Sequence, residues 1–218
     1  MNYYIISYKE NPTGESGEQC KTEYDFTYAC DECGTGAEVI GNLRVKSLSN
    51  IKKDFFETID GDFIVSNRFY QNIKSYFANL ELNQVRDSKN QLMDFFHFNS
   101  NIVLPKFGNN STGYIVENQC PICKRNGYFC DAQIGNVETK TPTIIKPLIL
   151  KYKKRELEEF ENSIIMKTWE CYGLSNKIPK GKYLTRYARP LIIVNETMKT
   201  IFGNEGITNV DFDKIMIE

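Results

Sequence analysis

The amino-acid sequence predicts an α+β fold of two related strand-helix-strand halves, with mostly antiparallel sheets and a pair of zinc knuckles. Two observations lead to this prediction. A short apolar strand followed by a capped amphipathic helix occurs twice in the 218-residue chain, at an offset of roughly 130 residues. Each half also contains one Cys-x-x-Cys pair. A chain of this length can bury a core without disulfides, as one large domain or two small ones.

The first elements predict a hairpin that ends in a metal knuckle. Residues Asn2 to Tyr8 are rich in aromatic and β-branched side chains, which favours a strand, and the polar stretch Lys9 to Gln19 predicts a loop. The next strand is indicated by alternating aromatic residues that lead to Cys30, namely Tyr24, Phe26 and Tyr28. Residues Glu38 to Leu48 return as a second strand, so the thiols should lie at the tip of a hairpin.

The first strand-helix-strand unit follows. Asp62 to Val65 predicts a short buried strand and Ser66 an N-cap, because its hydroxyl can accept a free backbone amide. The helix and the closing strand are indicated by apolar residues at helical and then alternating spacing: Phe69, Ile73 and Phe77, followed by Leu80, Leu82 and Val85.

The same order recurs near the C-terminus. Leu191 to Val194 predicts a strand and Asn195 the N-cap of a helix. The helix face and the terminal strand are indicated by Met198, Ile201 and Phe202, followed by Val210, Phe212 and Ile215. We therefore interpret the two units as copies of one motif, with Ser66 and Asn195 in equivalent places.

Between the two units the sequence contains a strand and a candidate boundary. Gln91 to Phe98 is an aromatic-rich strand that contains His97, the only histidine, which we expect to be structural. The glycine and asparagine cluster from Gly108 to Gly113 indicates a loop. It suggests an N-terminal half at 1–107 and a C-terminal half at 114–218, with one continuous domain as the alternative.

Two further stretches of the C-terminal half have simple interpretations. Gly127 to Ile134 alternates like a strand, with Tyr128, Cys130 and Ala132 on one face. Lys151 to Glu161 is charged on nearly every turn and predicts a solvated amphipathic helix, with Trp169 anchoring its end.

The cysteines carry the strongest chemical signal in the sequence. The motifs Cys30-Asp31-Glu32-Cys33-Gly34 and Cys120-Pro121-Ile122-Cys123-Lys124 each place two thiols three residues apart. Two such turns can supply four thiolates to one tetrahedral zinc ion, which is a closed structural site. One or two redox-active pairs, or reduced thiols in the core, are the alternative interpretations. The predicted metal ligands are Cys30, Cys33, Cys120 and Cys123.

The remaining three thiols have no partner in sequence. Cys130 could replace one of the four ligands, but its alternating surroundings favour a core position. Cys20 and Cys171 stand alone and are expected to be structural.

Charge and motif content exclude several classes of function. The chain has 27 basic and 28 acidic residues spread along its length, which provides no electrostatic footprint for nucleic acid or for a membrane surface. We expect no membrane span, no export signal and a cytoplasmic protein with reduced or metal-bound thiols. The sequence contains no phosphate-binding glycine loop, no zinc-protease motif and no second histidine for a Cys/His nucleophile. We therefore expect no enzymatic activity.

The two knuckles and the two capped helices together resemble the double-CXXCG family of bacterial immunity proteins. The second motif departs from that family at Lys124, where a glycine is expected, and this departure concerns the geometry of the second knuckle. The resemblance implies a small cytosolic protein that binds and neutralises one cognate toxin of a polymorphic toxin system. It implies the four knuckle cysteines as a zinc site and no catalytic residue. A zinc-ribbon module associated with nucleic acid and a thiol-disulfide redox protein are the alternatives.

Overall fold

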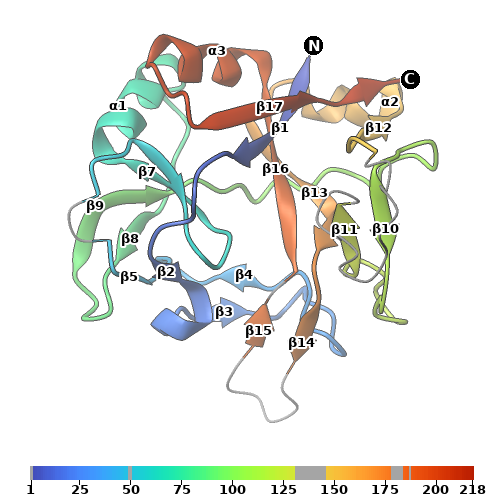
Figure 1. Ribbon diagram of the computed structural model, residues 1–218, viewed down its shortest axis with the longest axis horizontal. Helices are drawn as coiled ribbons and strands as arrows, with labels where there is room; N and C mark the ends of the chain where they lie inside the picture. Colours follow the sequence, from blue (N-terminus) through green and yellow to red (C-terminus); the bar gives the residue numbers. More distant parts are fainter. Residues whose placement is uncertain (1, 49–50, 131–145, 178–183, 187) are drawn as a thin grey trace, which may run out of the picture.

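The computed structural model describes all residues except 1, 49–50, 131–145, 178–183 and 187. It contains helices among many mostly antiparallel strands, so the predicted α+β class is confirmed. Two larger sheets organise the described chain (Figure 1). The first has six strands in the order β10 (Tyr114–Val116), β11 (Tyr128–Cys130), β13 (Ile165–Tyr172), β16 (Arg189–Asn195), β1 (Tyr3–Tyr8) and β17 (Val210–Lys214).

The second sheet has four antiparallel strands. Their order is β6 (Phe55–Glu57), β7 (Phe63–Ser66), β9 (Leu92–His97) and β8 (Gln84–Arg86). Smaller strand pairs surround the two sheets: β2 (Glu15–Ser16) with β5 (Val45–Lys46), β3 (Tyr24–Asp25) with β4 (Glu38–Val39), β12 (Lys151–Tyr152) with β18 (Met216–Ile217), and β14 (Ser175–Lys177) with β15 (Leu184–Arg186).

Both predicted N-caps are present, and each begins a helix. Helix α1 (Asn67–Tyr76) starts after Ser66, whose hydroxyl accepts the Phe69 amide at 3.2 Å. Helix α3 (Glu196–Asn204) starts after Asn195, whose side-chain oxygen accepts the Met198 amide at 2.9 Å. Each cap satisfies an amide that the first turn leaves without a partner.

The two strand-helix-strand units occupy matching places in their sheets. Strand β7 pairs with β6 on one side and β9 on the other, and β9 separates it from β8. Strand β16 pairs with β13 and β1, and β1 separates it from β17. All six pairings are antiparallel. The inserted strand β9 is local in sequence, whereas β1 comes from the start of the chain.

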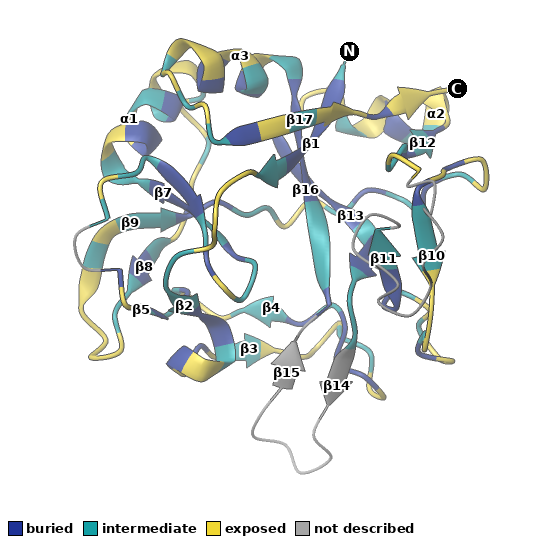
Figure 2. Ribbon diagram, viewed as in Figure 1, coloured by how far each residue is buried: buried dark blue, intermediate teal, exposed yellow. Residues whose placement is uncertain are grey.

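A shared apolar core lies between the two sheets and the two helices. Alternate residues of β1 divide between two cores, since Tyr4 and Ile6 enter the shared core while Tyr3 and Ile5 enter a second one on the other face. The rings of Phe69 and Phe202 meet edge to face at 4.9 Å between their centroids, and Figure 2 shows buried segments on both helices. Strand β1 belongs to residues 1–107 but lies within the sheet of residues 114–218, so the sheets do not divide at residues 108–113.

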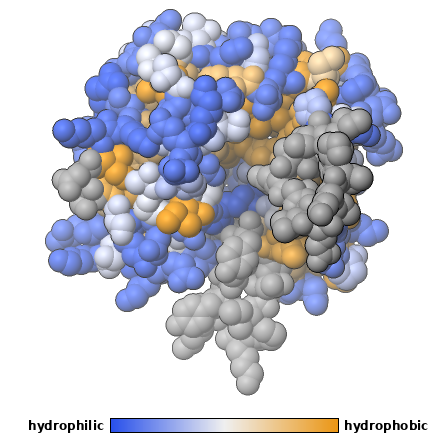
Figure 3. Space-filling model, in the orientation of Figure 1, coloured by the Kyte–Doolittle hydropathy of each residue, from blue (hydrophilic) through white to orange (hydrophobic). Residues whose placement is uncertain are grey.

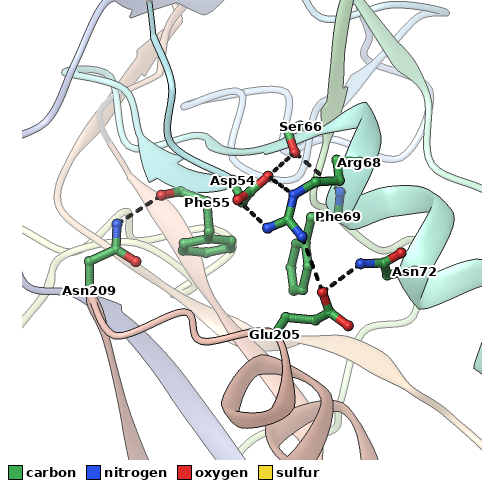
Figure 4. A network of polar contacts seen from close by, with 8 residues as sticks. All are labelled: Asp54, Phe55, Ser66, Arg68, Phe69, Asn72, Glu205 and Asn209. Carbon is green, nitrogen blue, oxygen red and sulfur yellow. Dashed lines mark hydrogen bonds and ion pairs between the residues drawn. The ribbon is translucent and has the colours of Figure 1, made fainter.

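A polar network above this core also joins the two helices. Arg68 of α1 binds Asp54 and reaches Glu205 at 3.4 Å, and Glu205 also accepts a hydrogen bond from Asn72 (Figure 4). Asp54 in turn accepts a hydrogen bond from the capping hydroxyl of Ser66. Hydrogen bonding by Arg68 lowers the pKa of Asp54, which keeps this carboxylate ionised.

Some sequence predictions differ from the structure. The expected helix at Lys151 to Glu161 is reduced to β12, a single turn α2 (Lys154–Leu157) and a 3₁₀ turn at Glu158–Phe160. Trp169 does not anchor that helix, because it lies in strand β13, which the sequence analysis did not predict. The strand expected at Gly127 to Ile134 is present as β11, and its residues beyond 130 lie outside the described part of the chain.

Candidate metal centre

The first knuckle is the tip of the β3–β4 hairpin, as the sequence predicted. The Gly34 amide donates to the Cys30 carbonyl at 2.7 Å, and the Cys30 amide donates to the Thr35 carbonyl at 3.0 Å. The turn uses the left-handed backbone region at Gly34, where φ is 73°. Glycine adopts this region without the clash that a Cβ atom causes. The chain therefore turns back sharply enough to place Cys30 and Cys33 beside one another.

The second knuckle repeats this turn with a different residue. It is the tip of the antiparallel β10–β11 hairpin, and the Lys124 amide donates to the Cys120 carbonyl at 3.1 Å. Lys124 has a φ of 54°, so it occupies the same left-handed region as Gly34. The Asn126 side chain accepts the Cys120 amide at 2.8 Å and braces the turn. The departure from glycine at Lys124 thus leaves the turn intact.

The two hairpin tips bring all four predicted thiols together. The sulfur atoms of Cys30, Cys33, Cys120 and Cys123 all lie within 4.8 Å of one another. Across the two knuckles, Cys30 is 3.9 Å from Cys120 and Cys33 is 3.6 Å from Cys123. A tetrahedral ion with metal–sulfur bonds of about 2.3 Å would separate its ligand sulfurs by roughly 3.8 Å. The geometry of the cluster therefore fits four-thiolate coordination.

The thiols sit in a partly desolvated setting. Burial raises the pKa of Cys33 and raises the pKa of Cys123 to about 12. Burial also acts on Cys120, but amide hydrogen bonds from Cys123 and Ile122 outweigh it and lower the pKa of Cys120. The Arg125 amide approaches the Cys123 sulfur at 3.5 Å. Because burial keeps Cys33 and Cys123 protonated, a metal that binds these thiols as thiolates would release their protons, so metal binding and proton release are linked.

The other three cysteines stand outside this cluster. Cys130 lies in β11 and is half-buried, and burial raises its pKa. Cys20 is buried in the 3₁₀ turn Gly17–Cys20, and burial raises its pKa to about 11. Cys171 is buried in β13. The cluster therefore consists of the four predicted ligands, and Cys130 does not take the place of one.

His97 is in the predicted strand and is buried in a polar pair. Its Nε2 atom lies 3.6 Å from a carboxylate oxygen of Asp62, the residue before β7. Asp62 also accepts a hydrogen bond from the Ser16 hydroxyl at 2.7 Å. Arg189 approaches the same carboxylate at 3.9 Å. The histidine is thus part of a buried polar contact between the N-terminal strands and β16, and it is not a member of the thiol cluster.

Strand β13 supports both knuckles, and sequence reasoning missed it. Buried Lys167 binds Glu38, which follows the first knuckle, at 2.6 Å. Arg125, which follows the second knuckle, donates to the Trp169 carbonyl at 3.1 Å and stacks on its ring at 5.6 Å. The run Ile164-Ile165-Met166 was the signal that could have revealed this strand.

Glu170 in the same strand is a second feature that the sequence analysis missed. The residue has no exposed surface, and one carboxylate oxygen accepts the Phe107 amide at 3.0 Å. The other oxygen has no hydrogen-bond partner. Burial raises the pKa of Glu170 to about 7.

A small cavity lies beside the cluster. Its volume is about 60 Å³, and its wall includes the charged residues Glu38, Asp62, Arg125, Lys167 and Arg189. Ligand and substrate sites usually measure about 300–1,000 Å³. The cavity therefore has room for solvent rather than for a typical substrate.

Comparison with known proteins adds no family assignment: no family model matches the chain, and no curated protein matches its sequence. Within the described residues, none of the helices has the length and apolar character needed to cross a bilayer.

Proposed function

We propose that this chain is a non-catalytic immunity protein, which binds one cognate bacterial toxin in the cytosol and is stabilised by a structural zinc ion. The observation that carries the proposal is the four-thiol cluster, in which Cys30, Cys33, Cys120 and Cys123 are mutually within 4.8 Å. Four protein ligands would close the metal's coordination sphere and leave no position for a substrate or a water. A closed site of this kind stabilises a fold and performs no chemistry.

Zinc is the metal that this donor set favours. Soft thiolate ligands in a tetrahedral arrangement select zinc or iron, and a mononuclear four-thiolate site that joins two hairpins is typical of zinc. The cluster takes two ligands from each half of the chain, so the ion would fix the halves to one another. Its contribution would be to folding, since the cluster forms only when both hairpins are in place.

The toxin-binding role is supported by the resemblance of the two knuckles and the two capped helices to double-CXXCG immunity proteins. The near-neutral overall charge favours a protein partner over nucleic acid or an anionic membrane surface. The mechanism would be occlusion, in which a preformed surface covers the toxin's active site. The face in Figure 3 is largely hydrophilic with separate apolar patches, as on a protein that remains folded and free until it meets its partner.

Co-expression tests this proposal directly. An immunity protein must leave almost no toxin free, so the affinity should be nanomolar or better, about −12 kcal/mol. The toxin encoded beside this gene should stop growth when expressed alone, and growth should return when this chain is present. A toxin from an unrelated locus is the specificity control. Protection that fails while the protein stays folded and abundant, or dithiol oxidoreductase turnover by the purified protein, would overturn the proposal.

A further inference from the structure

The loop that leads into the first knuckle presents the most exposed large apolar side chain of the described residues. Tyr28 is 88% exposed, and Phe26 beside it is 38% exposed. Most tyrosines of the chain's two main cores are buried, as Tyr3 and Tyr152 are. An aromatic ring that is left in water costs solvation free energy, and tyrosine is among the residues that most often anchor protein interfaces.

Hydrogen bonds within this loop constrain its backbone. The amide and the hydroxyl of Thr27 both donate to one oxygen of Asp25, at 2.8 and 2.6 Å. The Ala29 amide donates to the Phe26 carbonyl at 3.0 Å, which closes a turn around Tyr28. Cys30 follows immediately and belongs to the thiol cluster. A bound metal would therefore anchor the loop, and an ordered loop loses little conformational entropy when a partner binds.

The charged residues of the segment around this loop are all acidic. Residues 22–40 contain five acidic residues and neither lysine nor arginine: Glu23, Asp25, Asp31, Glu32 and Glu38. Two of these are engaged inside the molecule, because Glu23 approaches Arg44 at 3.7 Å and Glu38 binds Lys167 at 2.6 Å. The other three, Asp25, Asp31 and Glu32, are exposed, and Asp25 and Asp31 also make contacts within the molecule. The rest of the chain has 27 basic and 23 acidic residues, so the segment from 22 to 40 is negative in a chain that is otherwise slightly positive.

From these observations we infer that the knuckle loop, residues 23–32, is the surface that docks onto a cationic surface of the cognate toxin. The inference rests on the proposed function and adds the location and the chemistry of the contact. Tyr28 and Phe26 enter an apolar recess of the partner, while Asp25, Asp31 and Glu32 face lysine and arginine side chains around it. The aromatic pair supplies most of the affinity, and the acidic rim accelerates the encounter.

The partner's chemistry follows from the sign of this charge. A toxin surface rich in lysine and arginine is the kind that surrounds sites for phosphate groups. Occlusion of such a site by an acidic, aromatic loop would block the toxin without any chemistry by this chain. The second knuckle offers no equivalent, because Lys124 and Arg125 follow its second cysteine.

The test measures binding of the neighbouring gene's toxin, in a catalytically inactive form, by calorimetry and stopped-flow kinetics. Tyr28→Ala should weaken the affinity at least about 30-fold. Glu32→Lys combined with Asp31→Lys should slow association about 10-fold at low salt and reduce its salt dependence. The matched controls are Tyr76→Ala, on an exposed tyrosine of α1, and Glu159→Lys, on an exposed carboxylate of the Glu158–Phe160 turn. Both should bind within about threefold of wild type.

The outcomes separate this inference from the proposed function. Every variant alters exposed side chains, and the metal content and melting temperature of each variant are measured beside its affinity to confirm that the thiol cluster and the fold are kept. If wild type binds tightly and the loop variants bind equally well, the docking surface is wrong and the immunity function stands. Equal losses in loop and control variants would also overturn it. If wild type itself does not bind the toxin, the proposed function falls, and the docking surface falls with it.

Discussion

The two halves of the chain contain the same two kinds of part, but they complete their sheets differently. Each half has a hairpin-tip knuckle and a capped strand-helix-strand unit. In the four-stranded sheet the strand inserted between β7 and β8 is β9, which follows β8 in sequence. In the six-stranded sheet the corresponding strand is β1, from the opposite end of the chain. The halves are therefore joined by a shared strand as well as by the thiol cluster.

Each half also contains a buried carboxylate, and the two carboxylates differ in their polar partners. Asp62, near the N-terminal knuckle, is met by the Ser16 hydroxyl, by His97 and by Arg189. One carboxylate oxygen of Glu170, in β13, accepts a hydrogen bond from the Phe107 amide, and the other oxygen has no hydrogen-bond partner. A buried polar atom without a partner costs stability. Glu170 is therefore a site at which burial of a carboxyl group lowers the stability of the fold.

The largest expected effect comes from removing one metal ligand in either half. Cys33→Ser and Cys123→Ser should each abolish high-affinity zinc binding and lower the free energy of unfolding by on the order of 5 kcal/mol, because the site closes only with four ligands. The melting temperature should fall by about 10–20 °C. Calorimetry on the purified variants measures this directly.

The matched control is Cys171→Ser, a buried thiol outside the cluster. It should cost about 1–2 kcal/mol, since it changes one buried side chain and leaves the four knuckle thiols in place. Equal effects at all three cysteines would mean that the knuckle thiols are ordinary core residues.

The next effect concerns Glu170 and has a defined dependence on pH. An ordinary glutamate has a pKa of about 4.3, and burial raises that of Glu170 to about 7. Between these values the unfolded chain releases a proton that the folded chain retains, so stability falls as the pH rises and stays low above 7. Glu170→Gln should therefore stabilise the protein more at pH 8 than at pH 5.5, by on the order of 2 kcal/mol.

Urea unfolding of the two proteins at both pH values provides the measurement. Exposed Glu159→Gln is the control and should show no such difference. A Glu170→Gln gain that is the same at both pH values would contradict the assignment of a buried, protonated carboxyl.

The smallest effect compares the residue that follows each knuckle. Gly34 and Lys124 both have positive φ, at 73° and 54°. Gly34→Ala should destabilise the protein by roughly 1–2 kcal/mol, because a Cβ atom is disfavoured there. Lys124→Gly should stabilise it by up to about 1 kcal/mol by relieving the same conflict. Denaturant unfolding of the zinc-loaded variants should show changes of opposite sign in the free energy of unfolding. Changes of the same sign would mean that the two turns are not equivalent.

Much of this arrangement could be read from local sequence. Ser66 and Asn195 are predictable because a capping side chain bonds an amide only three residues away. The four ligands are predictable because each Cys-x-x-Cys pair defines its own turn. The left-handed turn at Lys124 could not be read in this way, since lysine has no preference for it.

Other features depend on contacts between distant residues, and sequence patterns do not reveal them. Strand β13 contains two buried charged residues, Lys167 and Glu170. Lys167 binds Glu38 beside the first knuckle, and Glu170 accepts the amide of Phe107, so both depend on segments that are distant in sequence. The place of β1 between β16 and β17 is set by pairing across about the whole chain, which no local periodicity encodes.

The most direct test of the central claim is the metal content and thiol reactivity of protein purified without chelator. One zinc ion per chain is expected, with Cys30, Cys33, Cys120 and Cys123 protected from a thiol reagent in the folded protein until a strong chelator removes the ion. Zinc release should restore reactivity at these four positions together. Protein without bound metal, in which all seven thiols react freely while the fold persists, would contradict the account.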